Sequence, residues 1–160
     1  MVGAERALAD VDAVTLSILA QPFVNRGRIA VGGQSRGGAL AIAWSGRKPG
    51  MACAVLNFAG GWFGADCWSA DDVNHALLKL GVPSGRRSLW LYSADDPYYG
   101  PLESRGNFAA FQAAGGDGAY YSYAPPPGVS GHDITLVPKF WSDDLERYLA
   151  VQGLRGEPAS

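Results

Sequence analysis

The sequence predicts an α/β protein in which a mainly parallel sheet of about four strands carries helices on its faces. Short apolar runs typical of strands alternate with helical segments along the 160 residues. Apolar residues make up 48% and charged residues 18%, which suits a globular core and excludes a disordered chain. The 22 glycines and 10 prolines show no period, so they indicate tight turns and not a repeat array. We expect a single minimal domain spanning 1–160.

The first three expected elements are a helix, a strand and a second helix. Residues 4–20 carry apolar side chains at helical spacing, and Pro22 ends the segment. A short strand follows at 28–33, and 36–47 is expected to form a helix that stops before Pro49. The apolar positions of the first helix predict one buried stripe, formed by Ala7, Val11, Val14 and Ile18.

The middle of the chain predicts two strands with a helix between them. Residues 52–58 form a nearly continuous apolar run, which is typical of a strand covered on both faces. Residues 71–80 are expected to form a short helix that ends at Gly81, and 88–93 to form the next strand. Alternation of this kind makes βαβ units, so the strands are expected to run parallel.

The last third predicts a helix at 103–114, a strand at 119–123 that stops at prolines 125–127, and a helix at 138–151. The apolar faces of these two helices are expected to be Phe108 with Phe111 in the first, and Trp141, Leu145 and Tyr148 in the second. Because catalytic residues of parallel sheets gather at the carboxyl ends of the strands, we expect them in the loops that follow the four strands.

Charge and hydropathy exclude several classes of function. A net charge of −2 without a basic face argues against a nucleic-acid partner. The longest apolar runs, such as 52–56 and 89–92, fall far short of the roughly 20 residues that cross a bilayer. Because the first residues lack the features of a secretory signal, we expect a cytoplasmic protein. Cys53 and Cys67 are expected to be free, inert thiols, with a single disulfide as the alternative, and no metal or other cofactor is expected.

A Gly-x-Ser-x-Gly motif follows the first strand and opens the next helix. Its central residue is Ser35, flanked by Gly33 and Gly37. A nucleophile elbow needs small residues at these two positions, because the turn is strained and a Cβ there is expected to collide with its neighbours. The alternative is a glycine-rich turn that only joins strand to helix. A phosphate-binding loop is excluded, because no Lys-Ser or Lys-Thr follows at the required spacing.

Acidic and histidine candidates follow the third and fourth strands. Asp95 and Asp96 form an acidic pair after the third strand, where a carboxylate can orient a histidine or simply cap a turn. His132 lies in the loop after the fourth strand, where a general base is needed. The other histidine, His75, is expected to be a solvated surface residue.

The order Ser35, Asp96, His132 is the order in which α/β-hydrolases carry their triad. The chain resembles the carboxyl-terminal part of a dienelactone hydrolase-like α/β-hydrolase. The matching segments are 33–38 with the elbow, 57–61, 89–92 running into the acidic pair, and 131–132. The resemblance implies that Asp96 and not Asp95 is the acid. Because the namesake enzymes have a Cys nucleophile where this chain has Ser35, it implies ordinary ester hydrolysis.

We therefore expect a serine carboxylesterase that cleaves small or short-acyl esters. The amide of Arg36 is expected to be one oxyanion donor, and amides of 60–62, above all Gly61 and Trp62, the second. A catalytically impaired fragment that serves as an assembly or binding domain is the alternative. The residues expected to contact the ester are Gln34, Trp62, Phe63, Tyr98 and Tyr99.

The resemblance also implies a shortened amino-terminal half, because members of the fold usually carry several strands before the elbow. The first strand then becomes a sheet edge with no central Lys or Pro to block pairing. We therefore expect a homo-oligomer, either a dimer or a tetramer, with a small ester as the only other partner. The alternative is a monomer in which the amino-terminal helix folds over this edge.

Overall fold

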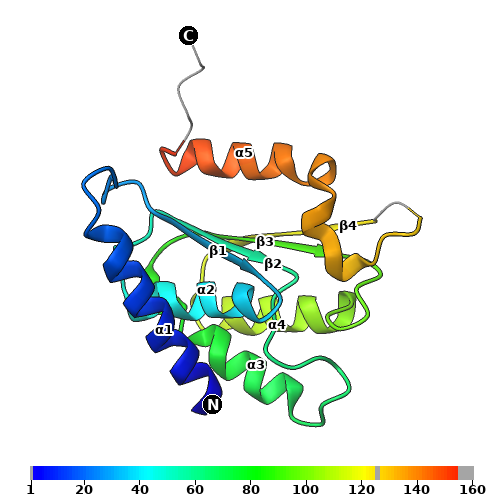
Figure 1. Cartoon of the computed structure of the whole chain (residues 1–160). Helices are drawn as coiled ribbons and strands as arrows, with labels where there is room; N and C mark the ends of the chain where they lie inside the picture. Colours follow the sequence, from blue (N-terminus) through cyan, green and yellow to red (C-terminus); the bar gives the residue numbers. More distant parts are fainter. Residues whose placement is uncertain (1, 125–126, 155–160) are drawn as a thin grey trace.

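The computed structural model describes residues 2–124 and 127–154 and confirms the expected class, a four-stranded parallel sheet between layers of helices (Figure 1). Its strands, in spatial order, are β1 (Ala30–Gln34), β2 (Ala54–Phe58), β3 (Ser88–Ser93) and β4 (Gly118–Tyr123). All neighbours pair in parallel, with Gln34 beside Phe58 and Ser93 beside Tyr123. The carboxyl ends of the strands therefore lie along one edge.

Helices cover both faces of the sheet. Successive strands are joined by α2 (Arg36–Arg47), α3 (Ala70–Lys79) and α4 (Pro101–Ala113). Figure 1 shows these three on one side together with α1 (Val2–Leu19), and α5 (Ser142–Val151) on the other. The bounds of α2 and β3 are those expected, and most other elements differ by a few residues at their ends.

The last expected helix is divided in two. Residues Pro138–Phe140 form a separate 3-10 turn, and α5 begins only at Ser142. Trp141, between them, has φ −127°, which is outside the helical range. Its ring packs edge-on against Phe58 with centroids 4.9 Å apart, so contact with the sheet overrides the helical pattern. The expected strand stop at Pro125 and Pro126 lies outside the described residues.

The expected inner faces of α4 and α5 are confirmed. Phe108 and Phe111 each pack against Trp90 of β3, with ring centroids 5.2 Å away. On the opposite face, the Tyr148 hydroxyl accepts a hydrogen bond from the Val55 N–H at 2.9 Å. Every residue of β3 is buried, so this strand lies at the centre of the core.

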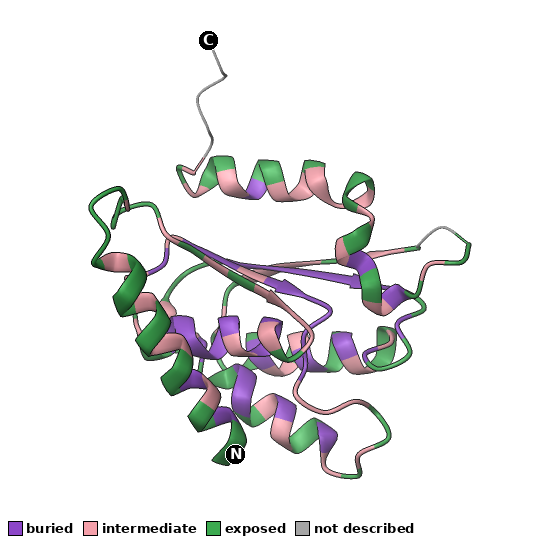
Figure 2. Ribbon diagram, viewed as in Figure 1, coloured by how far each residue is buried: buried purple, intermediate pink, exposed green. Residues whose placement is uncertain are grey.

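α2 lies closest to the sheet because its sequence is rich in glycine and alanine. Nearly all of its residues from Gly38 to Gly46 are buried, as Figure 2 shows by colour. A Cβ on Gly46 would overlap the Leu80 carbonyl, so α2 and the end of α3 pack backbone against backbone. This packing fixes the carboxyl end of α2 against the end of α3.

The expected buried stripe of α1 is wrong: Ala7 and Val11 are only half-buried, Val14 and Ile18 are exposed, and the fully buried residues lie outside the stripe. Ala4 and Leu8 are each 1% exposed, whereas Val14 and Ile18 are 59% and 49% exposed. Figure 2 shows α1 as the least buried of the helices under the sheet. Its first half packs on α2, and its second half extends beyond the end of that contact, so the apolar repeat there has no described layer to pack on. Among the described residues, no helix is both long and apolar enough to cross a membrane.

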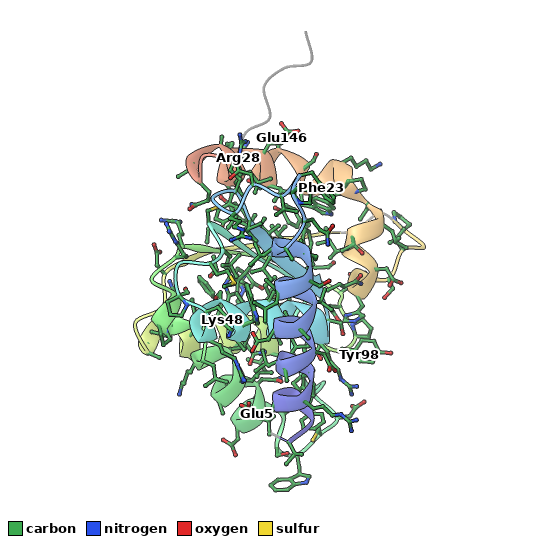
Figure 3. The ribbon with its side chains drawn as sticks, turned by 60° about the vertical axis from the view of Figure 1, so that its left-hand side comes forward. Glu5, Phe23, Arg28, Lys48, Tyr98 and Glu146 are labelled. Atoms are coloured by element: carbon green, nitrogen blue, oxygen red, sulfur yellow. The ribbon has the colours of Figure 1, made fainter. Side chains whose placement is uncertain are left out.

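β1 is an edge strand of the described sheet. An apolar groove of about 510 Å³ lies between it and the second half of α1, with Val14, Ile18 and Val31 among its lining residues. Figure 3 brings this side forward and shows Phe23 beyond the end of α1, where its side chain is 82% exposed.

Candidate active site

Ser35 is the single residue between β1, which ends at Gln34, and α2, which begins at Arg36. Its backbone has φ 57° and ψ −127°, a conformation that L residues adopt at a cost of about 1–3 kcal/mol. The Ser35 N–H donates to the Phe58 carbonyl at 2.9 Å, and the Ser35 carbonyl accepts from the Gly38 N–H at 3.0 Å. These bonds hold the strained turn, and such a turn raises a serine hydroxyl above the edge of a sheet.

The glycines around Ser35 are needed at different positions than expected. A Cβ on Gly33 would overlap the backbone of Gly37, as the motif requires. A Cβ on Gly37 would meet nothing within 4 Å, so the expectation that Gly37 is sterically required is wrong. The tight position is Gly38, where a Cβ would overlap the buried amide oxygen of Asn57. The close approach of α2 to β2 therefore depends on Gly38.

Asp96 follows β3 and contacts His132. The carboxylate is buried, and its Oδ2 lies 3.0 Å from His132 Nδ1. Its Oδ1 accepts the backbone N–H groups of Tyr98 at 2.8 Å and Tyr99 at 3.0 Å. Asp95 is exposed and accepts a hydrogen bond from the Ser93 hydroxyl instead. Of the acidic pair, Asp96 is therefore the residue that orients the imidazole.

The loop that carries His132 is a 3-10 helix, Gly131–Leu136, whose first turn is capped by the Ser130 hydroxyl. Gln34 Nε2 donates to the His132 carbonyl at 2.6 Å, and Gln34 Oε1 accepts from the Thr135 hydroxyl at 2.8 Å. Gln34 was expected to contact substrate. It does line the pocket, but both polar ends of its side chain are committed to this loop.

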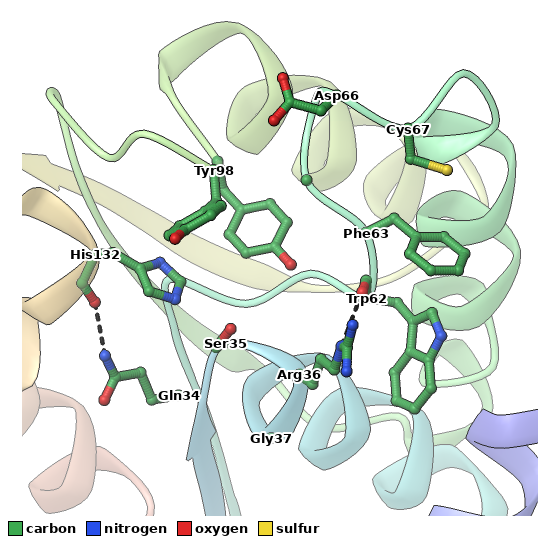
Figure 4. Close-up of a pocket in the computed structure, with 12 residues that line it drawn as sticks. Gln34, Ser35, Arg36, Gly37, Trp62, Phe63, Asp66, Cys67, Tyr98 and His132 are labelled. Carbon is green, nitrogen blue, oxygen red and sulfur yellow. Dashed lines mark hydrogen bonds between the residues drawn. The ribbon is translucent and has the colours of Figure 1, made fainter.

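Ser35 and His132 line one pocket of about 620 Å³ at the carboxyl edge of the sheet. Figure 4 shows the His132 imidazole and the Ser35 hydroxyl facing each other across it. The rest of the lining includes four aromatic residues, and these are the expected contact residues Trp62, Phe63, Tyr98 and Tyr99. Because Nδ1 is held by Asp96, Nε2 is the ring nitrogen that is available to the pocket.

The loop after β2 is fixed by a residue that the sequence did not single out. Asn74 of α3 is 3% exposed, and its Oδ1 accepts the N–H groups of Trp62 at 2.8 Å and Phe63 at 3.0 Å. The Asn74 amide also donates to the Phe63 carbonyl at 2.9 Å. The sequence could not reveal this role, because Asn74 lies among polar residues in the first turns of an expected helix and matches no motif.

The amides of Gly61 and Trp62, which were expected to supply the second oxyanion donor, are engaged in other hydrogen bonds. The Gly61 N–H donates to the Ser35 carbonyl at 3.3 Å, and the Trp62 N–H donates to Asn74. Both amides therefore already have acceptors within the protein. The Arg36 amide remains a suitable donor, because it occupies the first position of α2, where N–H groups have no partner within the helix. The Arg36 guanidinium is held by the Trp62 carbonyl at 3.2 Å.

Both cysteines are free, as expected. Cys67 also lines the pocket of Ser35, and hydrogen bonds from the Ser69 side chain and backbone lower the pKa of its thiol. This environment favours the thiolate, and the inertness of the thiol stays a prediction. His75 is partly buried in a neighbouring cavity of about 420 Å³ and does not line the pocket of Ser35. Within 2–124 and 127–154, no three His, Cys, Asp or Glu side chains are grouped to hold a metal ion.

Comparison with known proteins gave matches at the level of structure. No protein-family model matches the chain, and no curated protein matches it. A candidate dienelactone hydrolase from Klebsiella pneumoniae aligns with 94% of this chain at a TM-score of 0.64 and 20% identity. The carboxylesterase Cest-2923 from Lactobacillus plantarum aligns with 97% at a TM-score of 0.62 and 18% identity. A variant of SOBER1 from Arabidopsis thaliana aligns with 89% at a TM-score of 0.57 and 16% identity.

The chain has an α/β-hydrolase fold. The resemblance seen in the sequence is thus confirmed for the fold, although the chain spans only 61%, 69% and 64% of those three structures. In α/β-hydrolases the nucleophile, acid and histidine follow one another at strand ends. In this hydrolase fold the corresponding places, after β1, β3 and β4, are occupied by Ser35, Asp96 and His132.

Proposed function

We propose that the protein is a serine carboxylesterase acting on small or short-acyl esters. The observation that carries the proposal is the His132–Asp96 contact of 3.0 Å beside a serine held in a strained strand-to-helix turn. Ser35 is the nucleophile, His132 the general base and Asp96 the group that fixes the tautomer of the imidazole. The likeness in fold to a carboxylesterase from Lactobacillus plantarum supports the same class of reaction.

In the proposed reaction, Ser35 Oγ forms a bond to the ester carbonyl carbon and its proton passes to His132. The carbonyl electrons move onto oxygen, and the Arg36 N–H donates a hydrogen bond to the resulting oxyanion. When the carbonyl re-forms, the alcohol leaves with the proton from His132, and the acyl group remains on Ser35. A water molecule deprotonated by His132 then attacks the acyl carbon, and the carboxylic acid leaves as the bond to Ser35 Oγ breaks and His132 returns the proton to Oγ.

The dimensions of the pocket support a small substrate. A volume of about 620 Å³ lies within the range typical of small-molecule sites. Trp62, Phe63 and Tyr98 offer aromatic surface for a short acyl chain. Arg36 and Asp66 provide one positive and one negative side chain in the lining, which favours an uncharged ester.

Hydrolysis of p-nitrophenyl esters of increasing acyl length tests the proposal. We expect the acetate and butyrate to be cleaved faster than the octanoate or longer esters. Ser35→Ala is expected to lower kcat by roughly 10³-fold or more, because a triad without its nucleophile retains little activity. Equal turnover by the wild type and Ser35→Ala would exclude the proposed nucleophile.

Self-association is a second proposal, and it concerns assembly. We propose that two copies meet through β1, which is a sheet edge bordered by the apolar groove of Val14 and Ile18. Sedimentation velocity at micromolar concentration tests it. A dimer or tetramer that a Val31→Pro substitution in β1 dissociates is expected, and a monomer in the wild type overturns it.

A further inference from the structure

The oxyanion of the proposed reaction needs donors besides the Arg36 amide. Two backbone amides near the elbow already have partners, since the Gly61 N–H bonds to the Ser35 carbonyl and the Trp62 N–H bonds to Asn74. A further donor to the oxyanion has to be a polar group of the pocket that lies close to Ser35 Oγ. Side-chain hydroxyls serve as oxyanion donors as well as backbone amides do.

Tyr99 lines the pocket beside Ser35 and is fixed on several sides. Its side chain is 4% exposed, and its N–H donates to Asp96 Oδ1 at 3.0 Å. Its ring lies so close to Gly61 that a Cβ there would overlap Tyr99 Cε1. The ring centroid is 5.8 Å from that of His132. Tyr99 is therefore held between the acid, the histidine and the loop after β2.

The Tyr99 hydroxyl is suited to donate a hydrogen bond at this place. Burial raises the pKa of Tyr99, and the nearby Ser35 side chain offsets part of that rise. The positive charge of Arg36 acts in the same direction as Ser35, and the negative charge of Asp96 acts against it. The phenol therefore stays protonated at neutral pH. A Cβ on Gly61 would also overlap Tyr99 Cζ, the ring carbon that bears the hydroxyl, and the Gly61 N–H bonds to the Ser35 carbonyl, so the phenol end of the ring lies beside the elbow.

We propose that the Tyr99 hydroxyl donates the second hydrogen bond to the oxyanion formed when Ser35 attacks an ester. The proposal rests on the proposed esterase function. In the tetrahedral intermediate, Ser35 Oγ and the oxyanion are bonded to the same carbon, so a hydroxyl that lies beside the elbow needs only a small rotation to reach the oxyanion. Tyr99 keeps its proton throughout, while the proton of Ser35 passes to His132 and then to the leaving alcohol.

This arrangement explains why residue 61 is a glycine. A side chain at Gly61 would push the Tyr99 ring away from the elbow, because the two are in direct contact. The glycine expected to offer its amide instead makes room for the ring. One residue thereby links the two halves of the site, since the Tyr99 amide supports Asp96 and the hydroxyl serves the oxyanion.

The test compares Tyr99→Phe with the wild type in p-nitrophenyl acetate hydrolysis and in binding of a trifluoromethyl ketone, which forms a tetrahedral adduct with an active serine. We expect kcat to fall by about 10²–10³-fold, with KM changed only a few-fold and the ketone inhibition constant raised in parallel with the loss of kcat. Tyr120→Phe is the matched control, because the Tyr120 hydroxyl forms a hydrogen bond of 2.8 Å with Ser104 and Tyr120 does not line the pocket. This control is expected to leave kcat, KM and the ketone inhibition constant unchanged.

A second variant guards against misfolding of Tyr99→Phe. Replacing Tyr99 alone by 3,5-difluorotyrosine keeps the ring and hydroxyl but acidifies the phenol, so activity is expected to fall at a lower alkaline pH than in the wild type. An active wild type with unchanged kcat, ketone inhibition and alkaline profile in both variants overturns the role of Tyr99 and leaves the esterase intact. A wild type that neither cleaves the ester nor binds the ketone overturns both proposals.

Discussion

The Gln34 side-chain amide donates to the His132 backbone carbonyl at 2.6 Å, which connects the residue before the elbow to the loop that carries the histidine. The two are 98 positions apart in the chain and belong to β1 and the loop after β4. This bond sets the distance between the two sides of the pocket. Gln34 is therefore a positioning residue for His132.

Replacing Gln34 with Met is expected to lower kcat about 10- to 100-fold with little change in KM, because small displacements of a catalytic group reduce rates by such factors. Methionine has a similar length but cannot bond to the His132 carbonyl. Steady-state kinetics on p-nitrophenyl acetate measure the effect. Thr135→Val removes only the bond to Gln34 Oε1 and should cost less. A kcat within twofold of wild type in Gln34→Met would contradict the role.

Asp96→Asn is expected to reduce kcat by roughly 10³–10⁴-fold, because an amide at this position favours the wrong tautomer of His132. Asp95→Asn is the matched control, since Asp95 bonds to Ser93 and not to the histidine. It should keep most of the activity. Comparable losses in the two variants would show that the acid has been wrongly assigned.

The glycines of the elbow should differ in their tolerance of alanine. Gly37→Ala should leave the free energy of unfolding unchanged or raise it by up to about 1 kcal/mol, because the position is open and helical. Gly38→Ala should lower it by about 1–3 kcal/mol through the clash with Asn57. Urea denaturation of both variants measures the difference, and equal stabilities would refute it.

Stability should fall at high pH. Burial raises the pKa of Tyr92, Tyr99, Tyr123 and Tyr148 above that of an ordinary tyrosine. The folded protein then retains protons that the unfolded chain loses above about pH 10, so this stabilisation is complete below about pH 10 and is lost as the pH rises further. Urea denaturation between about pH 8 and pH 11 checks it. A free energy of unfolding that stays level throughout would count against the buried phenols.

Periodicity and strand-end logic predict much of this molecule, because they depend on local sequence. The bounds of α2 and the loop positions of Ser35, Asp96 and His132 follow from them. Contacts between distant segments carry no such local pattern. The roles of Gln34 and Asn74 depend on which loops meet in space, and the exposure of Val14 depends on where the neighbouring layer ends.

The steric contacts around the elbow could not be predicted from the sequence either. The Gly-x-Ser-x-Gly pattern treats its two flanking glycines alike, but only Gly33 has backbone within overlap distance. The pattern does not include Gly38, whose constraint comes from Asn57 on a neighbouring strand. Tyr99 was expected to contact substrate, and the packing of its ring against Gly61 beside the elbow became visible only with the fold.

Covalent labelling shows whether His132 activates Ser35 as a nucleophile. Wild-type protein, His132→Ala and Asp95→Asn are incubated with a fluorophosphonate, and the modified residue and its rate of formation are read by peptide mass spectrometry. We expect one adduct, on Ser35, that forms at similar rates in the wild type and Asp95→Asn and at least about 10²-fold more slowly in His132→Ala, because general-base assistance contributes about that factor or more. No adduct on Ser35, or an adduct that forms equally fast without His132, would contradict the account.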